Sequence, residues 1–243
     1  MIVIPMAGLS RRFTVAGYDV PKYMLPLAGK SVFAHAVGSF SELFATTPFL
    51  FIARSVADTE AFVRHECTML GIADARLAIL EQETAGQAET VELGLHETGV
   101  PDDEPVTIFN IDTFRRAFQF PTAPWFATSD GFLEVFRGAG ANWSYVGPNE
   151  NSADPLVERT TEKDPISDLC CDGLYHFARA GDFRSALTQE RARPSLPELY
   201  VAPLYNHLIR QGRLIHYDVV ADDSITFCGV PAEYQALLDV AGN

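Results

Sequence analysis

Residues suited to phosphate chemistry gather near the N-terminus, directly after the apolar segment 2–5. Small residues in this stretch let backbone N–H groups approach an anion closely. Arg12 and Lys22 follow and can neutralise the charge of a triphosphate. The joint spacing predicts a phosphate cradle, whereas Lys22 alone would be interpreted as a surface lysine. The backbone of the cradle is expected to come from Met6, Ala7, Gly8, Leu9 and Ser10.

A carboxylate follows the apolar segment 106–111. If this segment is a parallel strand, Asp112 lies at the carboxyl edge of the sheet, where α/β proteins bind their ligands. Mg²⁺ prefers carboxylate and phosphate oxygens, so Asp112 is predicted to hold Mg²⁺ against nucleotide phosphates. An isolated aspartate at this position would instead be interpreted as a turn or cap residue, and the upstream cradle favours the metal.

The elements that must position these residues alternate between strand and helix through the first half of the chain. Short apolar segments predict strands at residues 2–5, 49–53, 77–80 and 106–111. Between them, apolar residues recur at spacings of three or four, which is typical of helices buried on one face. Ser31 is placed to cap the first helix, which extends to Phe44, and Gly71 to end the second. A third helix carries Ala88 and Val91. The alternation predicts a mostly parallel sheet covered by helices.

The second half departs from this rhythm and predicts an added mixed β region. Strands separated by Gly-, Pro- and Asn-rich turns are expected near 131–136, 142–146, 156–159 and 171–177. A late amphipathic helix over 201–209 and a strand over 213–220 return the chain to the main sheet. The expected fold is therefore a single-domain, three-layer α/β/α protein, with no repeat and no interdomain linker. His176 alternates with apolar neighbours and is predicted to be a core residue.

Bulk properties narrow the class of partner. The formal net charge of −14 disfavours general attraction to nucleic acid or to an anionic membrane. No apolar run approaches the roughly 20 residues that a spanning helix needs, and the N-terminus lacks the pattern of a signal peptide. A cytoplasmic location follows as the expectation. The four cysteines contain no C-x-x-C pair, so buried, reduced thiols are predicted.

The cradle residues resemble those of the sugar-phosphate nucleotidyltransferase superfamily, whose pattern is G-x-G-[ST]-R followed by P-K. Gly8 and Pro21-Lys22 match, while Ser10 stands at the second glycine and Arg11 at the following Ser or Thr. The chain is most similar to capsule-associated members. The resemblance extends from residue 2 to about residue 235 and implies a Rossmann-like fold of the GT-A type. It implies one domain over residues 1–243, with a nucleotide half at about 1–115 and an acceptor half at about 116–243.

Further site residues are implied by the same resemblance. Gln87 and Thr90 open a helix beside the nucleobase, although a plain helix N-terminus is the alternative. Gln82 and Asn110 are also expected to bind the nucleotide. Glu162 and Lys163 match the family's Glu-Lys pair, in which the lysine reaches the acceptor phosphate, and a surface charge pair is the alternative. The acceptor is expected to pass close to Gly173.

The resemblance fails at the second metal ligand. Many members have an aspartate two residues before a glycine near the C-terminus, where this chain has Phe227 and Gly229. Asp222 and Asp223 lie just upstream, and Asp223 is the preferred replacement. An acidic turn is the alternative interpretation.

Together these features indicate an Mg²⁺-dependent nucleotidyltransferase. It would transfer the monophosphate of an NTP, by resemblance CMP from CTP, to a small phosphorylated acceptor and release pyrophosphate. The acceptor could be a sugar phosphate, a polyol phosphate or phosphoglutamine, for capsule or surface-glycan synthesis. Assembly into a homo-oligomer is left open. Two alternatives remain: a GT-A-type glycosyltransferase, although Asn110 replaces the first acid of a D-x-D motif, and a nucleotide-binding regulatory subunit without catalysis.

Overall fold

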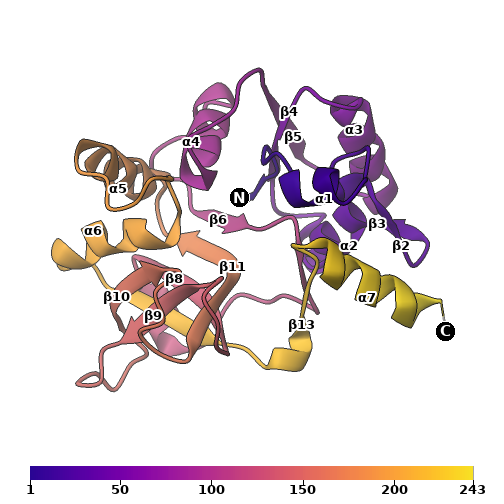
Figure 1. Cartoon of the computed structure of the whole chain (residues 1–243). Coiled ribbons are helices and arrows are strands. Elements are labelled where there is room, and N and C mark those ends of the chain that lie inside the picture. Colours follow the sequence, from indigo (N-terminus) through magenta and orange to yellow (C-terminus); the bar gives the residue numbers. More distant parts are fainter. Residues whose placement is uncertain (243) are drawn as a thin grey trace.

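A parallel four-stranded core forms one half of the central sheet. The computed structural model describes residues 1–242, so Asn243, the last residue of the expected domain, lies outside the described residues. The core strands are β1 (Ile2–Pro5), β4 (Phe49–Arg54), β5 (Ala75–Leu80) and β6 (Val106–Phe109). They lie in the order β5-β4-β1-β6, and all neighbours are parallel. Figure 1 labels β4, β5 and β6 of this core and marks the N-terminus, from which β1 begins. This arrangement confirms the parallel sheet expected from the first half of the chain.

Antiparallel strands extend the sheet beyond β6. These strands are β8 (Gly131–Arg137), β9 (Ser144–Pro148), β10 (Val157–Glu162) and β11 (Leu169–Phe177), joined by β12 (Ile215–Val219). The long strand β11 pairs with β6 through its second half and with β9 at Cys170. Its register against β8 shifts between Cys171 and Tyr175, which marks a bulge. Strand β12 returns to the main sheet, as the sequence predicts, and it pairs parallel with β8.

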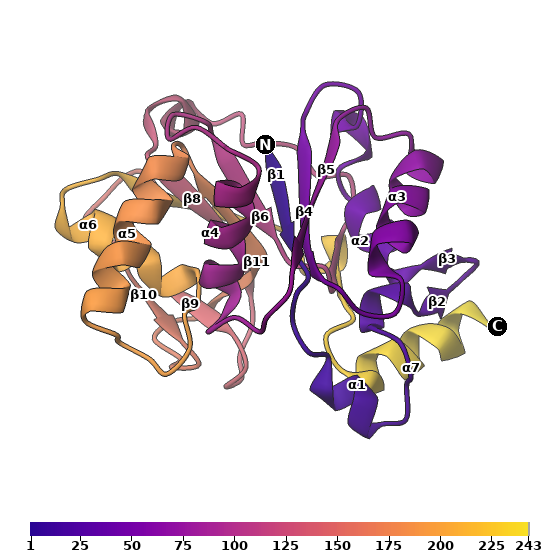
Figure 2. The ribbon, with the colours of Figure 1, turned by 90° about the horizontal axis from the view of Figure 1, so that it is seen from above.

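Helices cover both faces of the sheet and complete the three layers (Figure 2). One face packs against α2 (Val32–Gly38) and α3 (Thr59–Leu70), which contribute a core cluster rich in phenylalanine. The other face packs against α4 (Gln87–Glu97), α5 (Ala180–Ala192) and α6 (Tyr205–Arg210). The α/β/α fold class is therefore confirmed.

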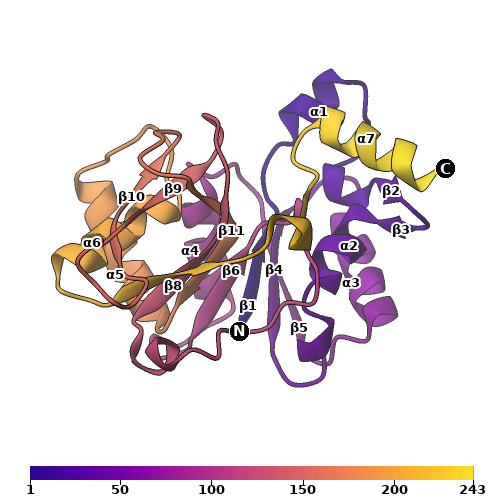
Figure 3. The ribbon, with the colours of Figure 1, turned by 90° about the horizontal axis from the view of Figure 1, so that it is seen from below.

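The C-terminal helix packs against the N-terminal part of the chain (Figure 3). Helix α7 (Pro231–Ala241) lies beside α1 (Arg11–Val15), where Tyr234 contacts Phe13 with ring centroids 6.2 Å apart. The remaining short strands are β2 (Pro26–Leu27), β3 (Lys30–Ser31), β7 (Thr113–Arg115) and β13 (Ile225–Phe227). The single-turn 3₁₀ segments are η1 (Lys22–Met24), η2 (Ser41–Leu43), η3 (Pro124–Thr128), η4 (Ala202–Leu204) and η5 (Asp222–Ser224).

Several element boundaries differ from the sequence prediction. The helix expected to reach Phe44 ends at Gly38, and a separate 3₁₀ turn follows. Helix α5 was not predicted, because its buried face has only two large apolar side chains, Phe183 and Leu187, beside two alanines and Glu190. Gly71 ends α3 in the left-handed conformation, as expected. All four cysteines are buried and free. Within the described residues, no helix has both the length and the apolar character needed to cross a bilayer.

Candidate active site

Three adjoining cavities open where β1 and β6 end. Their volumes are about 230, 670 and 380 Å³, and Gln87 lines all three. We call the first two the nucleotide cavities and the third the acceptor cleft, after the roles that the sequence analysis expects of the residues lining them. Open α/β sheets bind ligands at the carboxyl ends of their strands, so this crevice is the candidate active site.

The predicted cradle lines the nucleotide cavities. All five of its backbone residues line one or both of these cavities, as Met6, Ala7, Gly8, Leu9 and Ser10. Ser10 has a positive φ of 50°, a conformation that favours glycine and is compatible with the family's glycine at this position. Phe13 is buried and anchors the loop. Arg12 then faces the junction of the 670 Å³ cavity and the acceptor cleft.

Lys22 and Asp112 meet at the centre of the site. The Lys22 Nζ donates to Asp112 Oδ2 at 2.5 Å, and Asp112 lines both a nucleotide cavity and the acceptor cleft. Burial acts to raise the pKa of Asp112, but the Lys22 ammonium and, more weakly, Arg12 outweigh it and lower this pKa. Asp112 is therefore held as an anion. A Cβ on Gly229 would lie 3.0 Å from Asp112 Oδ2, so this glycine gives the carboxylate room.

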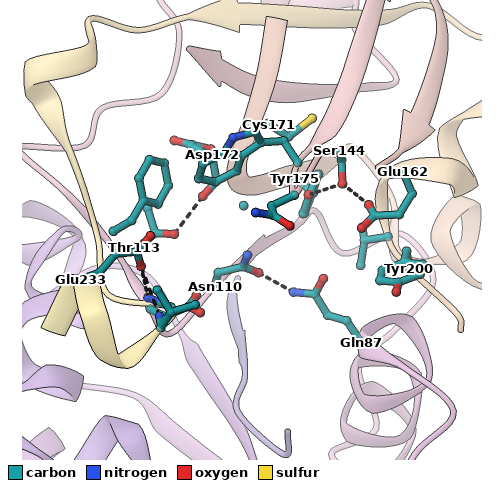
Figure 4. A pocket seen from close by; sticks show the side chains of 18 of the residues that line it. Gln87, Asn110, Thr113, Ser144, Glu162, Cys171, Asp172, Tyr175, Tyr200 and Glu233 are labelled. Atoms are coloured by element: carbon teal, nitrogen blue, oxygen red, sulfur yellow. Dashed lines mark hydrogen bonds between the residues drawn. The ribbon is translucent and has the colours of Figure 1, made fainter. Parts of the chain in front are cut away.

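A series of hydrogen bonds links the start of α4 to the bulge of β11. Gln87 Nε2 donates to Asn110 Oδ1 at 2.5 Å (Figure 4). Asn110 N donates to the Gly173 carbonyl at 3.1 Å. Gly173 has φ of 102°, and a Cβ there would lie 2.3 Å from Asn110 Nδ2. Thr113 Oγ1 also donates to the Asp172 carbonyl. The bulge therefore brings the end of β6 and the floor of the acceptor cleft together.

Two residues expected to bind the nucleotide, Thr90 and Gln82, lie in different surroundings from those expected. Thr90 is buried, and its hydroxyl bonds Thr84 Oγ1 at 2.7 Å and donates to the Gly86 carbonyl at 3.2 Å. It lines the 670 Å³ cavity, but its hydroxyl also supports the preceding loop. Gln82 is exposed and is not among the residues that line the three cavities.

The predicted Glu-Lys pair lies at the far side of the acceptor cleft. Glu162 accepts from the Ser144 hydroxyl and lies 3.8 Å from Lys163 Nζ. Burial raises the pKa of Glu162, although Ser144 and Lys163 act in the opposite direction. Lys163 Nζ donates to Tyr200 Oη at 2.7 Å, a bond that raises the pKa of this lysine. Glu162 and Tyr200 line the cleft, and Lys163 lies beside it.

The structure does not bring Asp223 to Asp112. Asp223 is exposed in a separate hollow that shares no lining residue with the three cavities. Strand β13 pairs antiparallel with β7, and Phe227 pairs with Thr113 beside Asp112. Asp223 precedes Phe227 by four positions, so it lies further along this ribbon. At about 3.3 Å per strand residue, Asp223 lies on the order of 10 Å away along the ribbon. Its placement does not support the expected role as second metal ligand.

Sequence reasoning did not identify several residues that line the acceptor cleft. Helix α7 contributes Glu233, whose Oε2 accepts from the backbone N–H groups of Gly229 at 2.7 Å and Val230 at 3.2 Å. The turn that precedes β9 contributes Trp143, which packs on Phe227 with ring centroids 4.6 Å apart. The glutamate three residues into a helix that begins with proline was a usable signal for Glu233. Nothing in the local sequence of Trp143 indicates its position.

The donor set around Asp112 fits a single hard cation. Among residues 1–242, no group of three or more His, Cys, Asp or Glu side chains is arranged to bind a metal ion. Mg²⁺ in nucleotide enzymes is commonly held by one or two carboxylates together with phosphate oxygens and water. An ionised Asp112 beside a phosphate cradle satisfies that requirement. The residues present are therefore compatible with Mg²⁺ brought in with a nucleotide.

The fold and the site define this chain as a protein with the sugar nucleotidyltransferase fold. A solved nucleoside-diphosphate-sugar pyrophosphorylase from Vibrio cholerae RC9 is 52% identical, with a TM-score of 0.93, and the match covers 98% of this chain and 100% of that chain. The chain therefore belongs to the nucleoside-diphosphate-sugar pyrophosphorylase family. No protein-family model and no curated protein matches the chain.

More distant solved structures share the fold alone. The inositol-1-phosphate CTP transferase from T. maritima is 11% identical with a TM-score of 0.73, and the match covers 100% of this chain and 96% of that chain. The UTP-bound UGPase from Acinetobacter baumannii is 13% identical with a TM-score of 0.72, covering 99% of this chain and 92% of that chain. Both likenesses support the same fold.

Proposed function

We propose that the chain is an Mg²⁺-dependent nucleotidyltransferase that joins the monophosphate of an NTP to a small phosphorylated acceptor. An oxygen of the acceptor phosphate would attack Pα, the bond from Pα to the bridging oxygen would break, and pyrophosphate would leave. The observation that carries the proposal is the Lys22–Asp112 pair, which lies between the phosphate cradle and a separate acceptor cleft. The names of the family member and of the more distant structures support it.

The residues of this chain would align and neutralise the substrates. Arg12, Lys22 and the cradle amides would bind the triphosphate, and Lys163 would turn from Tyr200 to the acceptor phosphate. Asp112 would hold Mg²⁺, which when bound would offset the charge that develops on the phosphates. No covalent enzyme intermediate is needed, because the acceptor phosphate is already a nucleophile.

The finer assignments extend the same proposal. Residues 1–115 would form the nucleotide half and residues 116–243 the acceptor half. CTP is the proposed nucleotide, by similarity to cytidylyltransferases of capsule pathways, and Gln87 is the residue best placed to contact its base. Capsule or surface-glycan synthesis in the cytoplasm is the proposed setting, in which both substrates are available.

Pyrophosphate release tests this function directly. The purified chain would be incubated with Mg²⁺, each of CTP, UTP, GTP and ATP, and a panel of phosphate monoesters. Release that requires both an NTP and an acceptor is the expected result. Release of a nucleoside diphosphate from a sugar nucleotide, in a parallel incubation without an NTP, would favour the glycosyltransferase alternative. Nucleotide binding without turnover of any acceptor would favour the regulatory alternative.

A further inference from the structure

Arg54 is a half-buried cation without a partner among residues 1–242. It is the last residue of β4, and within this part of the chain its side chain forms no hydrogen bond or ion pair. Its Nε is the only buried side-chain nitrogen there that has no hydrogen-bond partner. The other half-buried arginines are each ion-paired with a carboxylate, namely Arg76, Arg115, Arg184 and Arg213. An unpaired guanidinium in such surroundings favours an anion from outside the chain.

Arg54 lines a cavity of about 430 Å³ that adjoins the nucleotide cavities, and we call it the Arg54 cavity. Gly8 and Ser10 line all three, so the cradle lies at their junction. In the described part of the chain, the backbone N–H groups of Gly8, Leu9 and Ser10 donate to no backbone acceptor. Burial raises the pKa of Tyr23 and the Arg54 guanidinium acts against it, so this charge lies near Tyr23, which lines the same cavity.

The order of the strands places the Arg54 cavity on the side of the cradle away from the acceptor cleft. Strands β11, β6, β1 and β4 are neighbours in this order (Figure 2). Gly173 belongs to β11, Asp112 follows β6, the cradle follows β1, and Arg54 ends β4. Neighbouring strands lie about 4.8 Å apart, so the ends of β6 and β4 are separated by about 10 Å. The Arg54 cavity shares no lining residue with the acceptor cleft.

This arrangement matches the geometry of a displacement at phosphorus. The attacking and leaving oxygens lie in line, on opposite sides of the phosphorus atom. An acceptor phosphate that enters from the acceptor cleft therefore expels pyrophosphate toward the far side of the cradle, where the Arg54 cavity lies. Arginine suits this position, because its planar fork of N–H groups binds phosphate oxygens and its charge does not depend on physiological pH.

We infer that Arg54 is a further binding residue for the terminal phosphates of the nucleotide, and therefore for the pyrophosphate that leaves. This inference rests on the proposed function, because it assigns a ligand group of the same site. The sequence pattern identified Arg12 and Lys22, and Arg54 adds a third cation from another strand. Asp19 is exposed and also lines the Arg54 cavity, but no ion pair joins it to Arg54 within the described residues. The guanidinium is therefore available to an anion.

Inorganic pyrophosphate tests the inference independently of the nucleobase. Isothermal titration with pyrophosphate and Mg²⁺ would compare the wild-type chain with Arg54→Gln and Arg64→Gln. We expect Arg54→Gln to weaken binding at least tenfold. Arg64→Gln removes the same charge from an exposed side chain on α3 that lines none of these cavities, and it should change binding less than twofold. Unchanged binding in Arg54→Gln, equal weakening in both variants, or no binding by the wild type would overturn the inference.

The number of phosphates on the nucleotide provides a second measurement. The tightest ligand among CTP, UTP, GTP and ATP would be compared with its own diphosphate and monophosphate. In the wild type the triphosphate should bind at least tenfold more tightly than the diphosphate, and Arg54→Gln should reduce this ratio at least fivefold. The affinity for the monophosphate should be kept, which shows that the variant is folded. An unchanged ratio, or an equal loss of affinity for the monophosphate, would contradict the assignment.

Turnover separates this inference from the proposed function. If an NTP and an acceptor release pyrophosphate, but Arg54→Gln keeps the wild-type affinity for pyrophosphate, the proposed function stands and the role of Arg54 fails. If no acceptor supports release, but Arg54→Gln weakens pyrophosphate binding as expected, the binding role of Arg54 stands and the proposed function fails.

Discussion

At the scale of single residues, the site depends on a short contact between opposite charges. Lys22 comes from a 3₁₀ turn near the N-terminus and Asp112 follows β6, so 90 residues of chain separate them. The contact is partly buried, where each charge is costly without its partner. In the free protein Lys22 therefore satisfies Asp112. When a nucleotide and Mg²⁺ bind, the lysine could turn to phosphate and the carboxylate to the metal.

Removing the cradle cations should impair nucleotide use more than folding. We predict that Lys22→Ala and Arg12→Ala each lower kcat/KM for the NTP by on the order of 100-fold, because preorganised cations stabilise developing phosphate charge. Steady-state kinetics at saturating acceptor measure this effect. Arg64→Ala is the matched control, since Arg64 is exposed on α3, lies 2.9 Å from the exposed Glu60 and lines none of the three cavities. Wild-type kcat/KM in either cradle variant would show that the residue does not serve phosphate.

Asp112 should matter more to turnover than to the stability of the fold. Asp112→Asn keeps the volume but removes the anion, so we predict a fall in kcat of on the order of 100-fold or more and a higher Mg²⁺ requirement. Asp223→Asn should leave the Mg²⁺ titration unchanged, because this residue lies in a separate hollow. An Mg²⁺ curve shifted by Asp223→Asn, with Asp112→Asn active, would reverse the assignment.

At the scale of elements, the bulge in β11 decides the shape of the acceptor cleft. Strand β11 pairs with β6 on one stretch and with β9 on another, and Gly173 lies between the two. The left-handed backbone of Gly173 lets Asn110 approach within a distance that a Cβ would forbid. The element therefore couples the end of the nucleotide half to the floor of the acceptor cleft.

An added methyl group at this bulge should damage function and stability together. We predict that Gly173→Ala lowers the free energy of unfolding by about 1–3 kcal/mol, since it combines an unfavourable backbone with a clash on Asn110. Its kcat/KM for the acceptor should fall at least tenfold. Urea denaturation and steady-state kinetics measure the two effects.

Gly212→Ala provides the matched control for that prediction. Gly212 also has a positive φ, of 78°, but a Cβ there would meet nothing within 4 Å. The Gly212→Ala variant should lose about 1 kcal/mol of the free energy of unfolding, from the backbone conformation alone, and it should keep its activity. Equal loss of activity in the two variants would show that general destabilisation, and not the bulge, explains the effect.

At the scale of the whole molecule, a buried histidine lies where the parallel and the antiparallel strands of the sheet meet. His176 on β11 lies opposite Thr107 on β6, and its Nδ1 is 2.9 Å from Thr107 Oγ1. Burial lowers the pKa of His176 to about 3. The folded chain therefore keeps this ring neutral at a pH where the unfolded chain protonates it.

The pH dependence of stability should reveal this histidine. Below an unfolded pKa of about 6.5, protons bind the unfolded state preferentially, so stability falls as the pH falls. From pH 7 to pH 5 we predict that His176 accounts for a loss of about 2 kcal/mol in the free energy of unfolding, at about 1.4 kcal/mol per pH unit. Urea denaturation at the two pH values should show this loss in the wild type and a smaller one in His176→Gln.

An exposed histidine controls for the change of residue type. His65 lies exposed on α3, so His65→Gln should retain the wild-type pH dependence. If His176→Gln and the wild type lose the same free energy between pH 7 and pH 5, the buried ring is not the group that titrates.

Local sequence determined the parallel half of the fold and the cradle. Buried parallel strands are short, continuous apolar runs, and the intervening helices repeat every three or four residues, so these elements could be predicted. Met6 to Ser10, Arg12 and Lys22 are close in sequence, which is why their joint spacing carried a signal. Asp112 could be placed because it directly follows a strand of that kind.

Tertiary structure alone decided the acceptor cleft. Its lining comes from five strands and from α7, and the contacts of Trp143 with Phe227 and of Glu233 with Gly229 depend on how those elements pack. The nearest acids in sequence, Asp222 and Asp223, were misleading because the antiparallel ribbon carries them away from Asp112. A sequence pattern records periodicity along the chain, whereas a bulge and a ribbon register arise from pairing between distant segments.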